Sequence, residues 1–184
     1  HQALVSNGGG IAAAGSAGTL AVENALIENC VLTYAGDNGG GLFSEGFVTI
    51  RSSLFRGNGV NLGGTGGGLY AGGNLRVENS RFEKNEARWS FTGGAYAGGT
   101  MTVSGSTFRG NYGQTQGGGI CAAGSITVAN NSLFADNGSG FGGGIYGLGD
   151  ITVHCSRFEH HPADRGLSQP APGGSCWVFS AIAV

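Results

Sequence analysis

Charged residues are scarce in this sequence, and proline, methionine and lysine are scarcer still. Only 11% of the 184 residues are charged, three are proline, one is methionine, and the formal net charge is −2. A nearly neutral chain gives no electrostatic basis for binding nucleic acid or an anionic membrane surface. No apolar run has the length of a membrane-spanning helix, and no stretch has helical periodicity. We therefore expect no nucleic-acid partner, no membrane span and no helical fold.

Cysteine is also rare and irregularly placed. The four cysteines, Cys30, Cys121, Cys155 and Cys176, fall at four different places of the repeat described below. A disulfide requires two close and correctly directed Cβ atoms. An internal disulfide is therefore not expected, and the cysteines say little about the compartment.

Glycine, in contrast, is abundant, with 40 residues, and it recurs in short runs that open copies of one phrase. The clearest copy runs from Gly66-Gly67-Gly68-Leu69-Tyr70-Ala71 to Phe82-Glu83-Lys84-Asn85. Between equivalent Phe or Ile positions at 27, 55, 82, 108, 134 and 158, the steps are 28, 27, 26, 26 and 24 residues. A repeat of this length predicts stacked coils of a solenoid.

Each copy contains short segments typical of β-strands. Leu75-Arg76-Val77 and Ile126-Thr127-Val128 alternate apolar and polar residues, as expected of strands with one buried face. The glycine run with its Leu-Tyr-Ala continuation predicts a second strand, and Ser80-Arg81-Phe82 with its copies predicts a third. We therefore predict an all-β parallel β-helix with three short strands per coil and about six to seven coils.

The repeat also predicts the domain organisation. Residues 1–184 form a single β-helix domain, with coils starting near residues 8, 39, 66, 93, 117 and 142 and a partial coil starting at 173. The stretch 162–172 contains all three prolines, and we expect an irregular loop there.

Parallel stacking places equivalent residues of neighbouring coils above one another, so columns of side chains are predictable. One column is a turn that tolerates positive φ: Asn24, Ser52, Asn79, Gly105, Asn130 and Cys155. A second is a ladder of stacked amides: Asn29 or Cys30, then Asn58, Asn85, Asn111 and Asn137. Outward charges alternate in sign, as in Glu23-Arg51-Glu78 and Glu28-Arg56-Glu83, which predicts ion pairs between coils.

The paired signatures Gly-Gly-Ala/Gly-Ile/Leu and Phe-x-x-Asn, as in Gly66-Gly67-Gly68-Leu69 with Phe82-Glu83-Lys84-Asn85, carry a family likeness. They resemble the repeats of chlamydial polymorphic outer membrane proteins and, more broadly, right-handed β-helix proteins related to pectate lyases and autotransporter passenger domains. The likeness covers roughly residues 8–161, with Cys30 and His161 standing where Asn is expected. It implies a right-handed β-helix with a secreted or cell-surface role in adhesion or scaffolding.

Residues suited to catalysis or metal binding do not gather in the sequence. The 11 acidic residues are spread over different columns, and Glu45 and Asp150 lie near turns several coils apart. His154, Cys155, His160 and His161 are close in sequence but alternate between faces, unlike the convergent ligands of a zinc site. We therefore expect no enzyme and no cofactor or metal.

Aromatic residues are the candidate binding residues. Phe43, Tyr70, Tyr96, Tyr146 and Trp177, interrupted by Cys121, are predicted to point outward from one sheet as an aromatic stripe. The stripe could be a structural ladder, a protein interface or a glycan-binding surface. Trp89 and Phe91, in a loop that varies between copies, could contact a partner or pack on their own loop.

The two ends of the sequence match the same coil. Gly173–Val184 corresponds to the first half of a coil, and His1–Asn7 corresponds to the part that follows. We interpret this as continuation of a longer polypeptide or as head-to-tail association through Leu4, Val5, Cys176, Trp177, Ile182 and Val184. The sequence thus favours an extracellular structural or adhesive module that self-assembles into a fibre. The alternative is a carbohydrate-binding or polysaccharide-degrading fragment.

Overall fold

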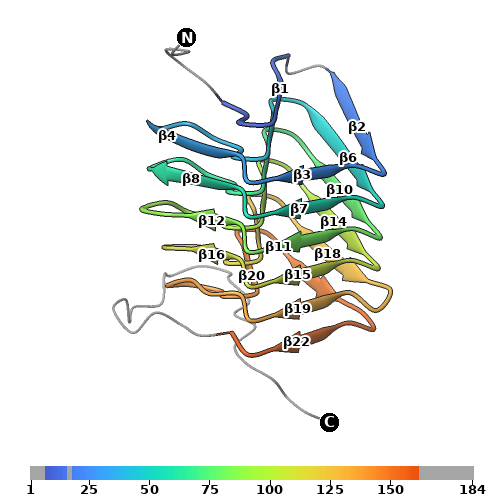
Figure 1. Cartoon of the computed structure of the whole chain (residues 1–184). Coiled ribbons are helices and arrows are strands. Elements are labelled where there is room, and N and C mark those ends of the chain that lie inside the picture. Colours follow the sequence, from blue (N-terminus) through green and yellow to red (C-terminus); the bar gives the residue numbers. More distant parts are fainter. Residues whose placement is uncertain (1–6, 16–17, 162–184) are drawn as a thin grey trace.

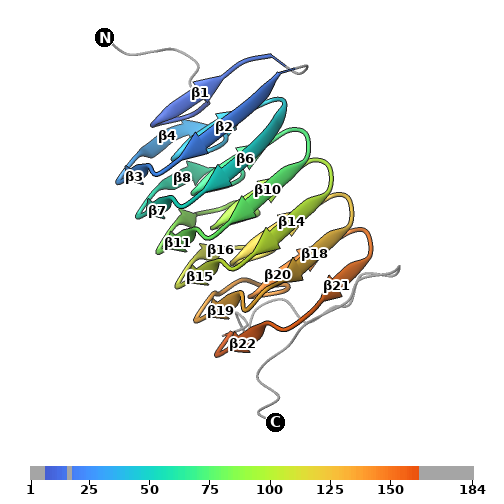
Figure 2. The same ribbon diagram turned by 90° about the vertical axis from the view of Figure 1, so that its right-hand side faces the viewer.

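The computed structural model describes residues 7–15 and 18–161, which form a solenoid of stacked β-coils (Figure 1). These residues contain 22 strands and no helix, so the described part of the chain has no helix that could cross a membrane. Figure 2 shows the coils lying above one another along a single axis. The elongated shape follows from a repeat in which each coil contacts mainly its neighbours.

Three sheets, each of six parallel strands, run along the axis. The first contains β1 (Ile11–Ala13), β5 (Leu42–Ser44), β9 (Leu69–Ala71), β13 (Ala95–Ala97), β17 (Ile120–Ala122) and β20 (Ile145–Gly147). The second contains β2 (Thr19–Glu23), β6 (Phe47–Arg51), β10 (Leu75–Glu78), β14 (Met101–Ser104), β18 (Ile126–Ala129) and β21 (Ile151–Val153). The third contains β3 (Leu26–Glu28), β7 (Leu54–Arg56), β11 (Arg81–Glu83), β15 (Thr107–Arg109), β19 (Leu133–Ala135) and β22 (Arg157–Glu159).

Each strand of these three sheets pairs with its equivalent in the next coil without a shift of register. Leu42 pairs with Leu69, and Phe82 pairs with both Phe55 and Phe108. This arrangement confirms the predicted parallel β-helix. Because register is exact from coil to coil, equivalent side chains form continuous columns inside and outside the solenoid.

The core is built from the inward positions of these three sheets. Its largest column consists of Phe55, Phe82, Phe108, Phe134 and Phe158, whose stacked rings have centroids 4.6 to 4.9 Å apart. The first four of these rings are fully buried. Each stacked pair contributes roughly 0.5–1.5 kcal/mol beyond the burial of apolar area.

A fourth sheet lies beside the three predicted ones, so three strands per coil was an underestimate. It contains β4 (Val31–Ala35), β8 (Gly59–Leu62), β12 (Glu86–Ala87) and β16 (Tyr112–Gly113), stacked along one side of the molecule (Figure 1). Leu32, Val60 and Ala87 are register partners in this sheet and form a second, smaller buried cluster. The segment before these glycine runs, which varies between copies and was expected to be a loop, therefore begins with a short strand.

The middle glycine of each run lets the fourth strand approach the first sheet. A Cβ atom on Gly67 would lie 2.3 Å from the backbone oxygen of Glu86 in β12. A Cβ on Gly40 would likewise lie 2.4 Å from the oxygen of Gly59 in β8. Both distances are too short for any side chain, so the glycine repeat is a requirement of backbone packing.

The predicted turn column has the expected backbone conformation. Its members all have positive φ: Asn24 (52°), Ser52 (46°), Asn79 (47°), Gly105 (57°), Asn130 (57°) and Cys155 (43°). Asparagine and glycine adopt this left-handed conformation more readily than other residues. The column therefore marks the bend between the second and third sheets in every coil.

The asparagine ladder is also confirmed, and it is buried. In Asn85, Oδ1 accepts hydrogen bonds from the backbone N–H and the Nδ2 of Asn58, at 3.0 and 3.1 Å. Its Nδ2 donates to the carbonyl oxygen of Phe55 and to Oδ1 of Asn111, at 3.0 and 2.9 Å. Because every polar atom of the amide is paired, burial of this side chain carries no unsatisfied group.

The ladder ends in a different residue at each side. At the first coil, the backbone N–H of Cys30 donates to Oδ1 of Asn58, so Cys30, not Asn29, occupies the column. At the last described coil, Nδ1 of His161 lies 3.2 Å from the carbonyl oxygen of Asn137. Among the described residues, Nε2 of His161 has no hydrogen-bond partner, although it is buried.

The histidine at the ladder end predicts a pH dependence. Burial is the main cause that lowers the pKa of His161 below 6.5, because a charged ring is poorly solvated there. The unfolded chain then binds more protons than the folded chain, so stability is full above pH 6.5 and falls as the pH drops below it. Urea unfolding between pH 5.0 and 7.5 measures this loss.

His161→Asn is the matched variant, because it restores the amide of the repeat and removes the titrating group. We expect this variant to be more stable than the parent chain at pH 5.0 and to vary less with pH. An identical pH profile for the two chains would contradict the assignment of the effect to His161.

Candidate binding surfaces

The predicted aromatic stripe exists as a column on the outer side of the first sheet. Phe43 and Tyr70 stack with centroids 5.3 Å apart, and Tyr70 and Tyr96 stack with centroids 5.2 Å apart. However, only 7% of Phe43 and 6% of Tyr146 is exposed, while Tyr70 and Tyr96 are half-buried. The stripe is therefore no continuous exposed patch, and its geometry favours the structural ladder. Trp177 lies outside the described residues.

Burial also determines the chemistry of this column. It raises the pKa of the Tyr96 and Tyr146 hydroxyls, and it raises the pKa of the Cys121 thiol to about 12. A thiol with such a pKa has almost no thiolate at neutral pH and is therefore a poor nucleophile. Among the described cysteines, which are all free, Cys155 is the exposed one.

Some of the outward charges form ion pairs between coils, as predicted, whereas Glu83 pairs with Arg81 of its own strand. Arg51 lies between Glu23 and Glu78, at 2.8 and 2.7 Å, and Arg56 pairs with Glu28. The hydrogen bond from Arg51 is the main cause that lowers the pKa of Glu78. The Glu78 carboxylate thus remains charged, and its pairing with arginine suits a role in register and solubility better than proton transfer.

The acidic residues, histidines and cysteines considered above for catalysis or metal binding are not brought together in the described part of the chain. Residues 7–15 and 18–161 contain no group of three or more His, Cys, Asp or Glu side chains that could hold a metal ion. Oε2 of Glu45 accepts a hydrogen bond from the N–H of Gly15 near the first coils, whereas Asp150 precedes β21 at the opposite end.

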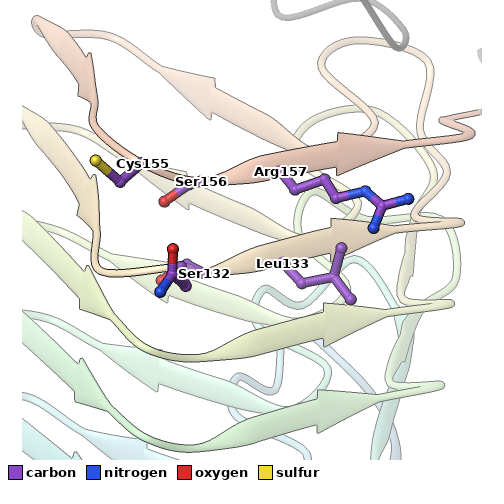
Figure 3. Close-up of a pocket in the computed structure, with 6 residues that line it drawn as sticks. Ser132, Leu133, Cys155, Ser156 and Arg157 are labelled. Atoms are coloured by element: carbon purple, nitrogen blue, oxygen red, sulfur yellow. The ribbon is translucent and has the colours of Figure 1, made fainter. Parts of the chain in front are cut away.

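An open depression of about 500 Å³ lies at the bend between the second and third sheets, near the last described coil. It is lined by Asn131, Ser132, Leu133, Cys155, Ser156 and Arg157. In Figure 3 the side chain of Arg157 extends along its strand away from Cys155. The described residues of the lining include no carboxylate and so supply no acid–base pair for cleaving a glycosidic bond.

The stacked parallel coils, the internal ladders and the sequence repeat agree with one known family. The family described as the right handed beta helix region matches residues 4–158. The chain belongs to this family. No curated protein and no solved structure matches the chain, so the narrower resemblance to chlamydial and autotransporter surface proteins remains a prediction.

In this β-helix, the loop residues predicted as contacts are on the surface. Trp89 and Phe91 follow β12, and 71% of Trp89 and 46% of Phe91 is exposed. Trp89 also has a φ of 59°, a conformation that costs a bulky residue about 1–2 kcal/mol. The loop therefore does not pack these aromatic side chains on itself. Their binding role remains a prediction.

The last described coil of the β-helix exposes part of its core. Val153 is 37% exposed and Phe158 is partly exposed, whereas their partners one coil earlier, Val128 and Phe134, are fully buried. The predicted junction residues Leu4, Val5, Cys176, Trp177, Ile182 and Val184 lie outside the described residues. Among the described strands, β20, β21 and β22 have a neighbour on one side only, as β1, β2 and β3 do at the other end.

Proposed function

We propose that this chain is a non-enzymatic structural and adhesive module of the cell exterior, whose end coils associate head to tail into a fibre. The observation that carries the proposal is the last described coil, where no further described strand pairs with β20, β21 and β22 and the core residues Val153 and Phe158 are partly exposed. Unpaired parallel edges are templates for further strands. The resemblance to surface β-helix proteins supports the extracellular location.

Head-to-tail contact joins two different ends of the molecule, so it does not close by twofold symmetry and instead propagates. In this proposal, Gly173–Val184 of one copy and His1–Asn7 of the next complete a shared coil. The ladders of apolar side chains and backbone hydrogen bonds would then continue across the junction, as they do between described coils.

A lysine placed in the end of the core tests the proposal. Val153→Lys puts a charge at a position that points inward but is already 37% exposed, so the isolated chain should tolerate it. Thr152→Lys is the matched control, because its side chain points outward on the same strand, β21. Light scattering after size exclusion and electron microscopy measure assembly.

We expect elongated particles for the parent chain and for Thr152→Lys, and single particles for Val153→Lys. Three monomeric proteins at high concentration would overturn the fibre proposal, as would equal assembly of all three. If a longer natural polypeptide carries further coils at this end, electron microscopy of that polypeptide would show one continuous rod without junctions.

Polysaccharide cleavage is the competing function. It requires a pair of carboxylic acids on one face of the solenoid, whereas the described glutamates of the second and third sheets are largely paired with arginine. Release of reducing sugar from acidic or neutral glycans, lost on Glu45→Gln, would favour cleavage over the structural role.

A further inference from the structure

The bend between the second and third sheets is one residue longer in one coil than in the four coils before it. Two residues, Gly105 and Ser106, connect β14 to β15, whereas Asn130, Asn131 and Ser132 connect β18 to β19. The strands on both sides of this bend remain in register with those of the neighbouring coil. The extra residue is therefore accommodated at the bend itself, as in a bulge.

Ser132 keeps its regular place in the repeat, so the extra length falls on the two asparagines. Oγ of Ser132 accepts a hydrogen bond from the backbone N–H of Ser106 at 3.2 Å, as Oγ of Ser106 does from the N–H of Ser80 at 3.1 Å. Asn130 and Asn131 are both exposed, with φ of 57° and 58°. Among the described residues, no other two consecutive non-glycine residues have positive φ. A strained surface bend over an intact ladder is a candidate functional feature.

The same three residues form an acceptor pattern for N-linked glycosylation. In this pattern an asparagine is followed by any residue except proline and then by serine or threonine. The sequence contains the pattern twice, at Asn130-Asn131-Ser132 and at Asn137-Gly138-Ser139. The surroundings of the two asparagines in the structure differ, and only one of them suits a sugar.

Asn137 is unsuited to carry a sugar. It belongs to the asparagine ladder and is fully buried. Its Nδ2 donates to the carbonyl oxygen of Phe108 at 2.8 Å, and its Oδ1 accepts hydrogen bonds from the backbone N–H and Nδ2 of Asn111 at 3.0 and 2.9 Å. A sugar on Nδ2 would need space inside a close-packed interior. A chain modified at Asn137 could therefore not close the ladder.

Asn130, in contrast, presents its amide to solvent. Its Nδ2 donates to Oγ of Ser104 at 2.7 Å, and this hydrogen bond is itself exposed. The amide nitrogen of asparagine has two hydrogens, and a sugar replaces one of them. The other hydrogen can still be donated to Ser104, so the modification is compatible with the folded bend.

The neighbours of Asn130 leave room for a sugar. In the turn column, Gly105 of the coil before has no side chain, and Cys155 of the coil after has a small, exposed one. Beside Asn130, Asn131 and Ser132 line the open depression of about 500 Å³ described above, which continues to Cys155 on the next coil (Figure 3). The first sugar can therefore lie over this bend without displacing a strand.

We propose that Asn130 carries an N-linked oligosaccharide, an inference that rests on the extracellular location proposed above. The donor is an oligosaccharide joined through pyrophosphate to a polyprenyl lipid. Nδ2 of Asn130 forms a bond to the anomeric carbon of the first sugar, and the bond from that carbon to the pyrophosphate oxygen breaks. The oxygen keeps the electron pair, so polyprenyl pyrophosphate leaves, and the amide nitrogen gives one proton to a base of the transferase.

The acceptor pattern is hidden once the coil has formed, so the transfer takes place on the unfolded chain. Ser132 is fully buried, and its Oγ donates to the carbonyl oxygen of Ala129 at 2.7 Å. A transferase that recognises this hydroxyl must reach it before folding. After folding, the glycan stands on the side of the solenoid and leaves both ends free.

Secretion of the full chain from cultured animal cells, behind a cleavable signal sequence, tests the proposal. Peptide-N-glycosidase releases the glycan and converts its asparagine to aspartate, so we expect the treated chain to migrate faster in electrophoresis. Mass spectrometry of peptides should find that conversion at Asn130 and not at Asn137. Asn130→Gly should lose the migration shift and remain folded, because glycine adopts the positive φ of this bend, as Gly105 does. Asn130→Asp, which keeps the size of the side chain, should lose the shift as well.

Asn79→Gly is the matched control. Asn79 is exposed in the same turn column with a φ of 47°, but Ser80 and Arg81 follow it, so it has no acceptor pattern. This variant should keep the migration shift. The proposal is overturned by a secreted parent chain without a glycan on Asn130, by a shift that persists in both Asn130 variants, or by its loss in Asn79→Gly.

Peptide mapping of the native protein from its source separates this inference from the proposed function. An extracellular native protein without a glycan on Asn130 would overturn the inference and leave the structural role standing. A native protein confined to the cell interior would refute the proposed location, and the native glycan with it.

Discussion

Asn85→Ala is expected to lower the free energy of unfolding by about 3–5 kcal/mol, since it interrupts the asparagine ladder at its centre. The substitution removes four side-chain hydrogen bonds. It also leaves the Asn58 backbone N–H and amide, the Phe55 carbonyl and Oδ1 of Asn111 short of a partner in a fully buried region. Each unpaired buried group costs about 1–3 kcal/mol, and partial relaxation recovers some of the total.

Guanidinium unfolding followed by circular dichroism measures this loss. Asn61→Ala is the control, because Asn61 lies in β8 of a neighbouring coil with a partly exposed side chain, and the change should cost at most about 0.5 kcal/mol. Equal destabilisation by the two substitutions would show that the ladder contributes no more than an ordinary surface asparagine.

Much of the fold is predictable from sequence because parallel coils stack in register. The recurrence of Phe82 and Asn85 in most copies was sufficient to place one in the core and the other in a hydrogen-bonded ladder, and both placements are confirmed. The turn column was equally predictable from the sequence, since small polar residues and glycine recur where positive φ is required.

The fourth sheet was not predicted because its strands carry no pattern of their own. Glu86–Ala87 and Tyr112–Gly113 are two residues long, too short for alternation to be detected. They become strands by pairing with the neighbouring coil. The available signal is the recurrent glycine run, which predicts the start of a strand but also marks the backbone that the fourth strand approaches.

The aromatic column is also less exposed than its outward position suggested. Alternation correctly places Tyr146 and Phe43 on the outer side of the first sheet, but an outer side chain can still be covered by neighbouring backbone. The first glycine of each run turns back over this column, since a Cβ on Gly142 would lie 3.1 Å from Cβ of Tyr146. Strand periodicity contains no information about such coverage.

Gly67→Ala is the second substitution with a large expected effect, about 3–5 kcal/mol of destabilisation. The added methyl group would lie 2.3 Å from the Glu86 oxygen and 2.6 Å from its carbonyl carbon. Both atoms belong to the backbone of β12, so no side-chain rotation relieves the overlap. The coil must open between the first and fourth sheets, and the buried cluster around Val60 and Ala87 is lost with it.

Gly63→Ala separates this overlap from the ordinary cost of replacing a glycine. Gly63 has a φ of 76°, but no atom lies within 4 Å of an added Cβ. Its substitution should therefore cost only the backbone strain, about 1–2 kcal/mol. Guanidinium unfolding measures both variants, and hydrogen exchange at Ala87 and Arg88 should be accelerated by Gly67→Ala but not by Gly63→Ala. If the two variants are equally stable, the fourth strand does not pack on the glycine backbone as described.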